Sequence, residues 1–89
     1  MEARYLEVTF RDGKALAAYL YLPRTPGMEV ARTEEPREGV LVDYDSTGTP
    51  MGVEITAPGY TSVEEINQVL ERINQPRLGP EELAPLAAA

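Results

Sequence analysis

A short polar segment between two alternating apolar runs constrains the fold of this chain more than any other feature. The apolar runs cover residues 40–44 and 51–55, and the segment between them starts with Asp45 and has Gly48 near its end. An Asp side chain at such a place bonds backbone two residues further on, and glycine takes the left-handed conformation that closes a short loop. The pattern therefore predicts a β-hairpin over residues 39–55.

The residues before this hairpin predict further strands. Residues 5–10 alternate between apolar and polar side chains, Asp12 and Gly13 favour a tight turn, and residues 15–22 are apolar on both faces. A strand that is apolar on both faces is expected to be covered on both sides. Residues 28–33 predict a weaker, polar edge strand, followed by a charged loop over residues 34–38 around Pro36.

The hydrophobic period changes after residue 60 from that of a strand to that of a helix. The apolar stripe consists of Val63, Ile66, Val69, Leu70 and Ile73. Ser62 and Glu65 have the spacing of a capping box, which marks the start of a helix, and Pro76 is expected to end it. Residues 78–89 predict either one short helical turn starting near Pro80 or disorder.

These elements predict an α+β fold, in which a small antiparallel sheet, a meander of four or five strands, is followed by one C-terminal amphipathic helix. We expect a single domain over residues 1–76 and a tail over residues 77–89. One helix covers only one face of the sheet, so the other face would expose Tyr5, Tyr19, Tyr21 and Leu41 to water. Monomers usually avoid an apolar surface of this kind. The sequence therefore predicts a homodimer, formed through this face or through an edge strand.

The composition argues against most enzyme mechanisms. The chain of 89 residues has no Cys and no His, so it offers no disulfide, no thiolate ligand and no imidazole as a proton shuttle. No hydroxyl group has a histidine or cysteine beside it to activate it as a nucleophile. We expect a non-enzymatic protein with no cofactor.

The charge indicates the kind of partner. A net charge of −7 disfavours binding to phosphate backbones and suits a basic protein partner, although an acidic balance is also common in bacterial cytosolic proteins. Residues 15–22 form the longest apolar run, which is too short to cross a bilayer, and the N-terminus does not resemble a signal peptide. We expect a cytoplasmic protein that binds neither nucleic acid nor membrane. Seven Arg and eight Pro hint at a GC-rich or thermophilic source.

Three acids in the second hairpin are the candidate polar site: Asp43, Asp45 and Glu54. If residues 45–48 are the loop, Asp43 lies opposite Pro50 and Glu54 lies opposite Gly39, which separates the two carboxylates by about 13 Å. That separation is too large for a shared ion, and Asp43 with Asp45 would make a poor cation site.

The other polar and aromatic residues also have a structural reading. Glu54 is expected at the surface, with Arg37 or a partner as the ionic alternative. The tyrosines are expected in the core or at a dimer interface rather than as a stacking platform for single-stranded nucleic acid, because no basic groove accompanies them. Gly52 is expected to allow close packing opposite Leu41.

The hairpin residues Val40-Leu-Val-Asp-Tyr-Asp, then Gly48, then Gly52-Val-Glu-Ile55 resemble a bacterial family known as domain of unknown function 2283. Residues 14–22 take the place of that family's first strand, and the likeness covers roughly residues 8–57. The resemblance implies a small antiparallel sheet domain with no assigned catalytic residue. Because some members lie beside genes for small toxin-like proteins, it also suggests, by analogy, an antitoxin-like or accessory role.

Two functional hypotheses result. The first is a non-enzymatic, acidic interaction domain that acts as a homodimer and binds a basic protein. The alternative is a small-ligand or divalent-cation binding module that uses the tyrosine face or Asp43 and Asp45.

Overall fold

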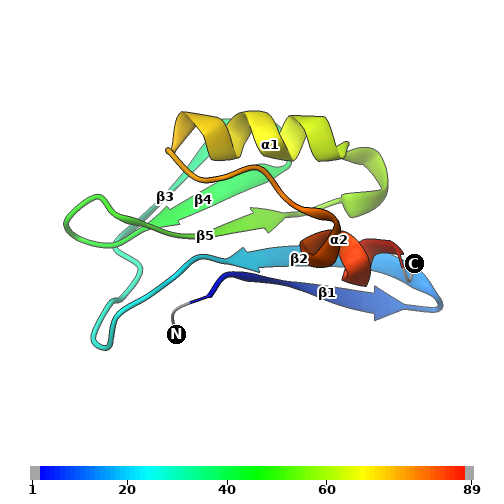
Figure 1. Ribbon diagram of the computed structural model, residues 1–89, viewed down its shortest axis with the longest axis horizontal. Coiled ribbons are helices and arrows are strands. Elements are labelled where there is room, and N and C mark those ends of the chain that lie inside the picture. The colour runs from blue at the N-terminus through cyan, green and yellow to red at the C-terminus, as the bar shows by residue number, and fades with distance from the viewer. Residues whose placement is uncertain (1–2, 88–89) are drawn as a thin grey trace.

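The computed structural model describes residues 3–87 and has one five-stranded antiparallel sheet with two helices on one of its faces (Figure 1). The elements are β1 (Tyr5–Arg11), β2 (Lys14–Tyr21), β3 (Arg32–Arg37), β4 (Val40–Tyr44), β5 (Pro50–Ile55), the 3-10 turn η1 (Pro58–Tyr60), α1 (Val63–Arg72) and α2 (Pro80–Ala87). The predicted α+β class with an antiparallel sheet is confirmed. No helix within residues 3–87 is long and apolar enough to cross a membrane.

The strand order is β1-β2-β5-β4-β3, which differs from the sequential order of a simple meander. The connection after β2 crosses to the far edge of the sheet, and the chain then returns through β4 so that β5 pairs with β2 at the centre (Figure 1). The central strands β2 and β5 therefore each pair with a strand on both sides, while the charged strand β3 lies at one edge of the sheet.

The predicted boundaries of this third strand were wrong. Residues 28–31 form no strand, and β3 instead covers Arg32–Arg37, which includes Pro36 and most of the expected loop. A proline has no N–H to donate to a ladder, so it is tolerated at a sheet edge or at a bulge. Both conditions hold here, because β3 is the edge strand and its register with β4 shifts between Glu34 and Arg37.

Both predicted turns are present. Asp12 and Gly13 have φ angles of 52° and 76°, and Gly48 has a φ of 88°. The Asp45 side chain accepts hydrogen bonds from the backbone N–H groups of Thr47 and Thr49, both at 2.9 Å.

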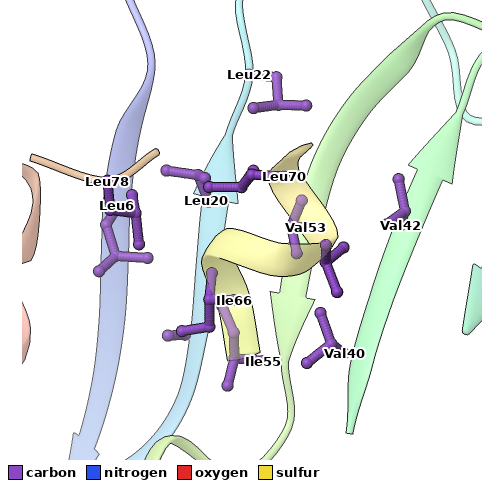
Figure 2. Close-up of a cluster of buried hydrophobic side chains, with 12 residues drawn as sticks. Leu6, Leu20, Leu22, Val40, Val42, Val53, Ile55, Ile66, Leu70 and Leu78 are labelled. Carbon is purple, nitrogen blue, oxygen red and sulfur yellow. The ribbon is translucent and has the colours of Figure 1, made fainter. Parts of the chain in front are cut away.

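The hydrophobic core lies between the sheet and α1. Alternate residues of β2, β5 and β4 point to this side, and their side chains are fully buried, as are those that α1 contributes (Figure 2). The core cluster consists of Leu6, Ala18, Leu20, Leu22, Val40, Val42, Val53, Ile55, Ile66, Val69, Leu70 and Leu78. Its size is small, so the loss of one large side chain removes a considerable share of it.

The helix α1 begins as predicted and ends earlier than predicted. Ser62 and Glu65 form the expected capping box. The helix ends at Arg72, because Asn74 takes the left-handed conformation with a φ of 60° and Gln75 N–H bonds Leu70 O at 2.8 Å. Pro76 therefore lies beyond the last helical residue. The prediction that Pro76 ends the helix was wrong, because the chain already leaves the helix before it.

A second helix, α2, starts at Pro80, where one of the two predicted alternatives placed a short helical turn, and it is longer than that turn. Leu78 is buried in the core, and its N–H donates to Oδ1 of the buried Asn67 at 2.8 Å. Asn67 is thus a buried polar residue of α1 whose side chain has a hydrogen-bond partner. The helix α2 then packs beside β1, where Arg4 donates two hydrogen bonds to Glu82 and one to the carbonyl of Arg77 (Figure 1). The segment after Pro76 thus contributes to the core.

The Arg4–Glu82 pair makes the attachment of α2 sensitive to acid. Hydrogen bonding from Arg4 holds the pKa of Glu82 below its usual 4.5. A lowered folded-state pKa contributes stability above the unfolded value, and that stability is lost as the pH falls through the folded value. We therefore expect Glu82→Gln to lower Tm at pH 7 and to have a smaller effect below about pH 4. Thermal unfolding of both proteins between pH 3 and pH 7 measures this; a constant Tm difference across that range would contradict it.

Candidate interaction site on the open sheet face

The face of the sheet opposite α1 and α2 has no element covering it among residues 3–87 (Figure 1). We call it the open face. Strand pairing arranges its side chains in two rows that run across the strands. The first row is Tyr5, Tyr21, Gly52, Asp43 and Thr33, and the second row is Glu7, Tyr19, Glu54 and Leu41. The structure thus brings together all four residues of the predicted apolar face and two of the three candidate acids.

Three of the tyrosines on this face contact one another. The rings of Tyr5 and Tyr21 are stacked, with centroids 4.7 Å apart and planes 16° apart. The ring of Tyr19 meets that of Tyr21 edge to face, also at 4.7 Å. The guanidinium of Arg24 lies 5.2 Å from the centroid of Tyr21. Tyr5, at the outer end of the cluster, is 46% exposed, while Tyr19 and Tyr21 are half-buried. We call these three residues the tyrosine cluster.

The side chain of Tyr19 reaches across β5 to the next strand. Its hydroxyl donates a hydrogen bond to Asp43 Oδ2 at 2.7 Å, and the ring passes directly over Gly52. A Cβ atom at Gly52 would lie 2.1 Å from Tyr19 Oη and 2.4 Å from Cζ, which no real contact permits. The Tyr19 ring therefore occupies the space that a side chain at position 52 would need. The prediction that Gly52 lies opposite Leu41 was wrong, since its neighbours are Tyr21 and Asp43.

Both carboxylate oxygens of Asp43 are engaged. Oδ2 accepts from Tyr19, and Oδ1 accepts from the hydroxyl of Thr33 on the edge strand β3. Burial raises the pKa of the Tyr19 hydroxyl, and the hydrogen bond to Asp43 raises it further. Tyr19 is therefore a neutral donor at physiological pH. The result is a hydrogen-bonded chain from β2 across β5 to β3 that fixes the Tyr19 ring.

The predicted register of the hairpin was wrong by two residues. Asp43 lies opposite Gly52 and Glu54 lies opposite Leu41, because the loop covers residues 45–49 and a bulge between Asp43 and Tyr44 adds another shift. Asp43 and Glu54 are thus diagonal neighbours, about 7–8 Å apart between Cα atoms rather than 13 Å. Glu54 is exposed, and its side chain makes no hydrogen bond or ion pair with another of residues 3–87. Its suggested partner Arg37 pairs with Glu65 at 2.7 Å instead.

Asp45 lies apart from this face and has a structural role in the loop. The hydroxyl of Thr47 and the backbone N–H groups of Thr49 and Thr47 donate to it and lower its pKa. Within residues 3–87 there is no group of three or more acidic side chains placed to hold a metal ion. The arrangement of Asp43 and Asp45 therefore gives no support to the cation-binding alternative.

Three further residues of the open face were not predicted as site residues from the sequence. Glu7 lies beside Tyr19 and accepts a 3.3 Å hydrogen bond from Tyr21; Arg24 caps the ring of Tyr21; and Thr33 orients Asp43. Alternation in β1 does place Glu7 on the same face as Tyr5, but it does not mark Glu7 as a site residue. Thr33 could be placed beside Asp43 only once the pairing of β3 with β4 was known.

Comparison with known proteins supports one assignment. A family model described as "Protein of unknown function (DUF2283)" matches residues 12–57, which are 46 of the 89 residues. The chain belongs to the DUF2283 family. The matched part of the chain runs from the β1–β2 turn to the residues just after β5, so it contains Tyr19, Asp43 and Gly52. Searches of curated proteins and of solved structures gave no significant match.

Proposed function

We propose that this DUF2283 chain is a non-enzymatic interaction domain whose open face binds a basic segment of a protein partner. The observation that carries the proposal is the tyrosine cluster, held in place on an uncovered sheet face, with the exposed carboxylates of Glu7 and Glu54 on either side of Tyr19. An antitoxin-like or accessory role, in which the partner is a basic toxin, is one form of this proposal.

The rigidity of the tyrosine cluster supports binding. Stacking fixes Tyr5 against Tyr21, and the hydrogen bond to Asp43 fixes Tyr19. Tyrosine has few rotatable bonds and offers both an apolar ring and a polar tip, so it gives a large contact area at a low entropic cost. Side chains that are already ordered before binding lose little freedom when the complex forms.

The charges of the open face support a basic partner. Glu7 and Glu54 stand on either side of Tyr19 in one row, separated by two strand spacings, or about 10 Å. Asp43 adds a third carboxylate, while Arg24 at the tyrosine cluster and Arg11 at the end of β1 contribute positive charge to the same face. Complementary charge accelerates association and discriminates against other partners. A second copy stacked on this face would instead bring carboxylates toward carboxylates, so the charges favour a basic partner over face-to-face dimers.

The test is selection of binding peptides from a displayed library of random 16-residue peptides on the immobilised wild-type protein. We expect the selected peptides to combine Lys or Arg with apolar residues. For a synthetic copy of the best peptide, Glu7→Lys with Glu54→Lys should raise Kd by at least about tenfold. Both positions are exposed, so these changes leave the core intact.

The control is Glu38→Lys with Glu29→Lys, which makes the same charge change at exposed positions off the open face. It should change Kd by less than about threefold, because only long-range charge is altered. Selection of peptides without basic residues, or equal weakening by both double variants, would overturn the proposal.

A further inference from the structure

The two edges of the sheet differ in how they are protected. In β3, five of six residues are charged or proline, and the register with β4 is irregular. Charged residues, proline and bulges all keep an edge strand from pairing with another chain. The other edge strand, β1, reads Tyr-Leu-Glu-Val-Thr-Phe-Arg and contains no proline. The shift in its pairing between Thr9 and Phe10 arises from an extra residue in β2, since Phe10 pairs with Ala15 and Thr9 with Ala17. β1 itself therefore continues without an inserted residue.

We propose that the chain forms a homodimer in which β1 pairs antiparallel with β1 of a second copy, centred on Val8. This inference rests on the edge and does not depend on the proposed function of the open face. A chain of this size buries little apolar surface by itself, so association with a second copy adds stability. Pairing at β1 would provide this by joining the sheets of the two copies into one.

Symmetry and charge together select the register. In an antiparallel pair of identical strands the twofold axis passes between two copies of the same residue. An axis at Glu7 would place two carboxylates directly opposite each other, which destabilises a sheet. An axis at Val8, the middle residue of the seven in β1, pairs the whole strand and places Glu7 opposite Thr9 of the second copy.

The side chains on both faces fit this register. On the helix side, Phe10, which is 41% exposed, would lie opposite Leu6 of the second copy and gain an apolar neighbour. On the open face, Tyr5 would lie opposite Arg11 of the second copy, a cation beside an aromatic ring. The axis is perpendicular to the sheet, so the two open faces would lie on the same side and form one continuous surface.

Single cysteines test this register directly, because the natural chain has none. Opposite residues in an antiparallel pair have Cα atoms about 4.5–5.5 Å apart, which falls within the range that disulfides span. Upon mild oxidation with copper phenanthroline, Val8→Cys should form a covalent dimer. Glu7→Cys and Thr9→Cys should cross-link far less, and Glu34→Cys on β3 serves as the control at the other edge. Preferential cross-linking of any position other than Val8, equal cross-linking of all, or none would overturn the proposal.

A second measurement covers the case in which Val8→Cys fails to fold. Molar mass by light scattering across a dilution series should show a dimer that dissociates on dilution. Phe10→Glu should raise the concentration at half-dissociation by at least about tenfold, since charge replaces apolar contact at the pairing edge. Val30→Glu, at a site that is 50% exposed and outside every strand, should leave it unchanged. A wild-type monomer throughout, or the same shift for both variants, would contradict pairing at β1.

Discussion

Replacement of Gly52 by alanine is expected to lower the free energy of unfolding by about 1–3 kcal/mol, the usual cost of forcing an extra carbon into a packed site. The added Cβ would lie where the Tyr19 ring now passes, within 2.1 Å of its hydroxyl oxygen. The ring would have to move away, and the hydrogen bond between Tyr19 and Asp43 would be lost. Chemical denaturation of Gly52→Ala and of the wild type measures the effect.

The same substitution should have the opposite sign once the ring is removed. In a Tyr19→Ala background the three atoms nearest to the added Cβ are removed, and a strand glycine is less favourable than alanine by about 0.5–1 kcal/mol. Gly52→Ala should therefore be neutral or stabilising there. If alanine at position 52 were equally destabilising in both backgrounds, the placement of Tyr19 over Gly52 would be wrong.

Replacement of Leu20 by alanine is expected to have the largest effect on stability, about 2–5 kcal/mol. Leu20 has no exposed surface and lies in the core cluster beneath α1 (Figure 2). A small domain has only about 5–15 kcal/mol of total stability, so this single change removes a large share of it. Because about 1 kcal/mol shifts Tm by roughly 4–8 °C in a chain of this size, a thermal scan detects the effect easily.

Leu16→Ala is the matched control for this prediction. Leu16 lies on the same strand, but its side chain is 53% exposed. Its replacement should cost no more than about 0.5 kcal/mol, as for surface changes in general. Similar losses for Leu16 and Leu20 would contradict the described position of β2 against the core.

The parts of the fold that depend on local chemistry could be predicted from the sequence. Asp12 with Gly13, Asp45 with Gly48, and Ser62 with Glu65 each act within a few residues, and all three features form as expected. The strand order could not be predicted, because it depends on which strands bury the most apolar surface together. The place of Pro36 in β3 depends on that order, since proline is tolerated only because β3 is an edge.

The residues of the open face were also predicted only where local pattern decides their position. Alternation along β1 and β2 placed Tyr5, Tyr19 and Tyr21 on one face. The contact between Tyr19 and Asp43 crosses an intervening strand, so it follows from the register of both pairings. A bulge and a five-residue loop shifted that register by two residues, and the sequence carries no clear signal for either. A glycine inside an alternating strand did signal a close approach, although not which residue approaches.

The measurement that tests the open face most directly is a titration of the 15N-labelled wild-type protein with the best selected peptide, followed by the amide signals. We predict that the largest shifts fall on β2, β4 and β5 residues of the open face, centred on Tyr19, Gly52 and Glu54, and that α1 stays unaffected. Shifts centred on α1 or on η1, with the open face unchanged, would contradict the account.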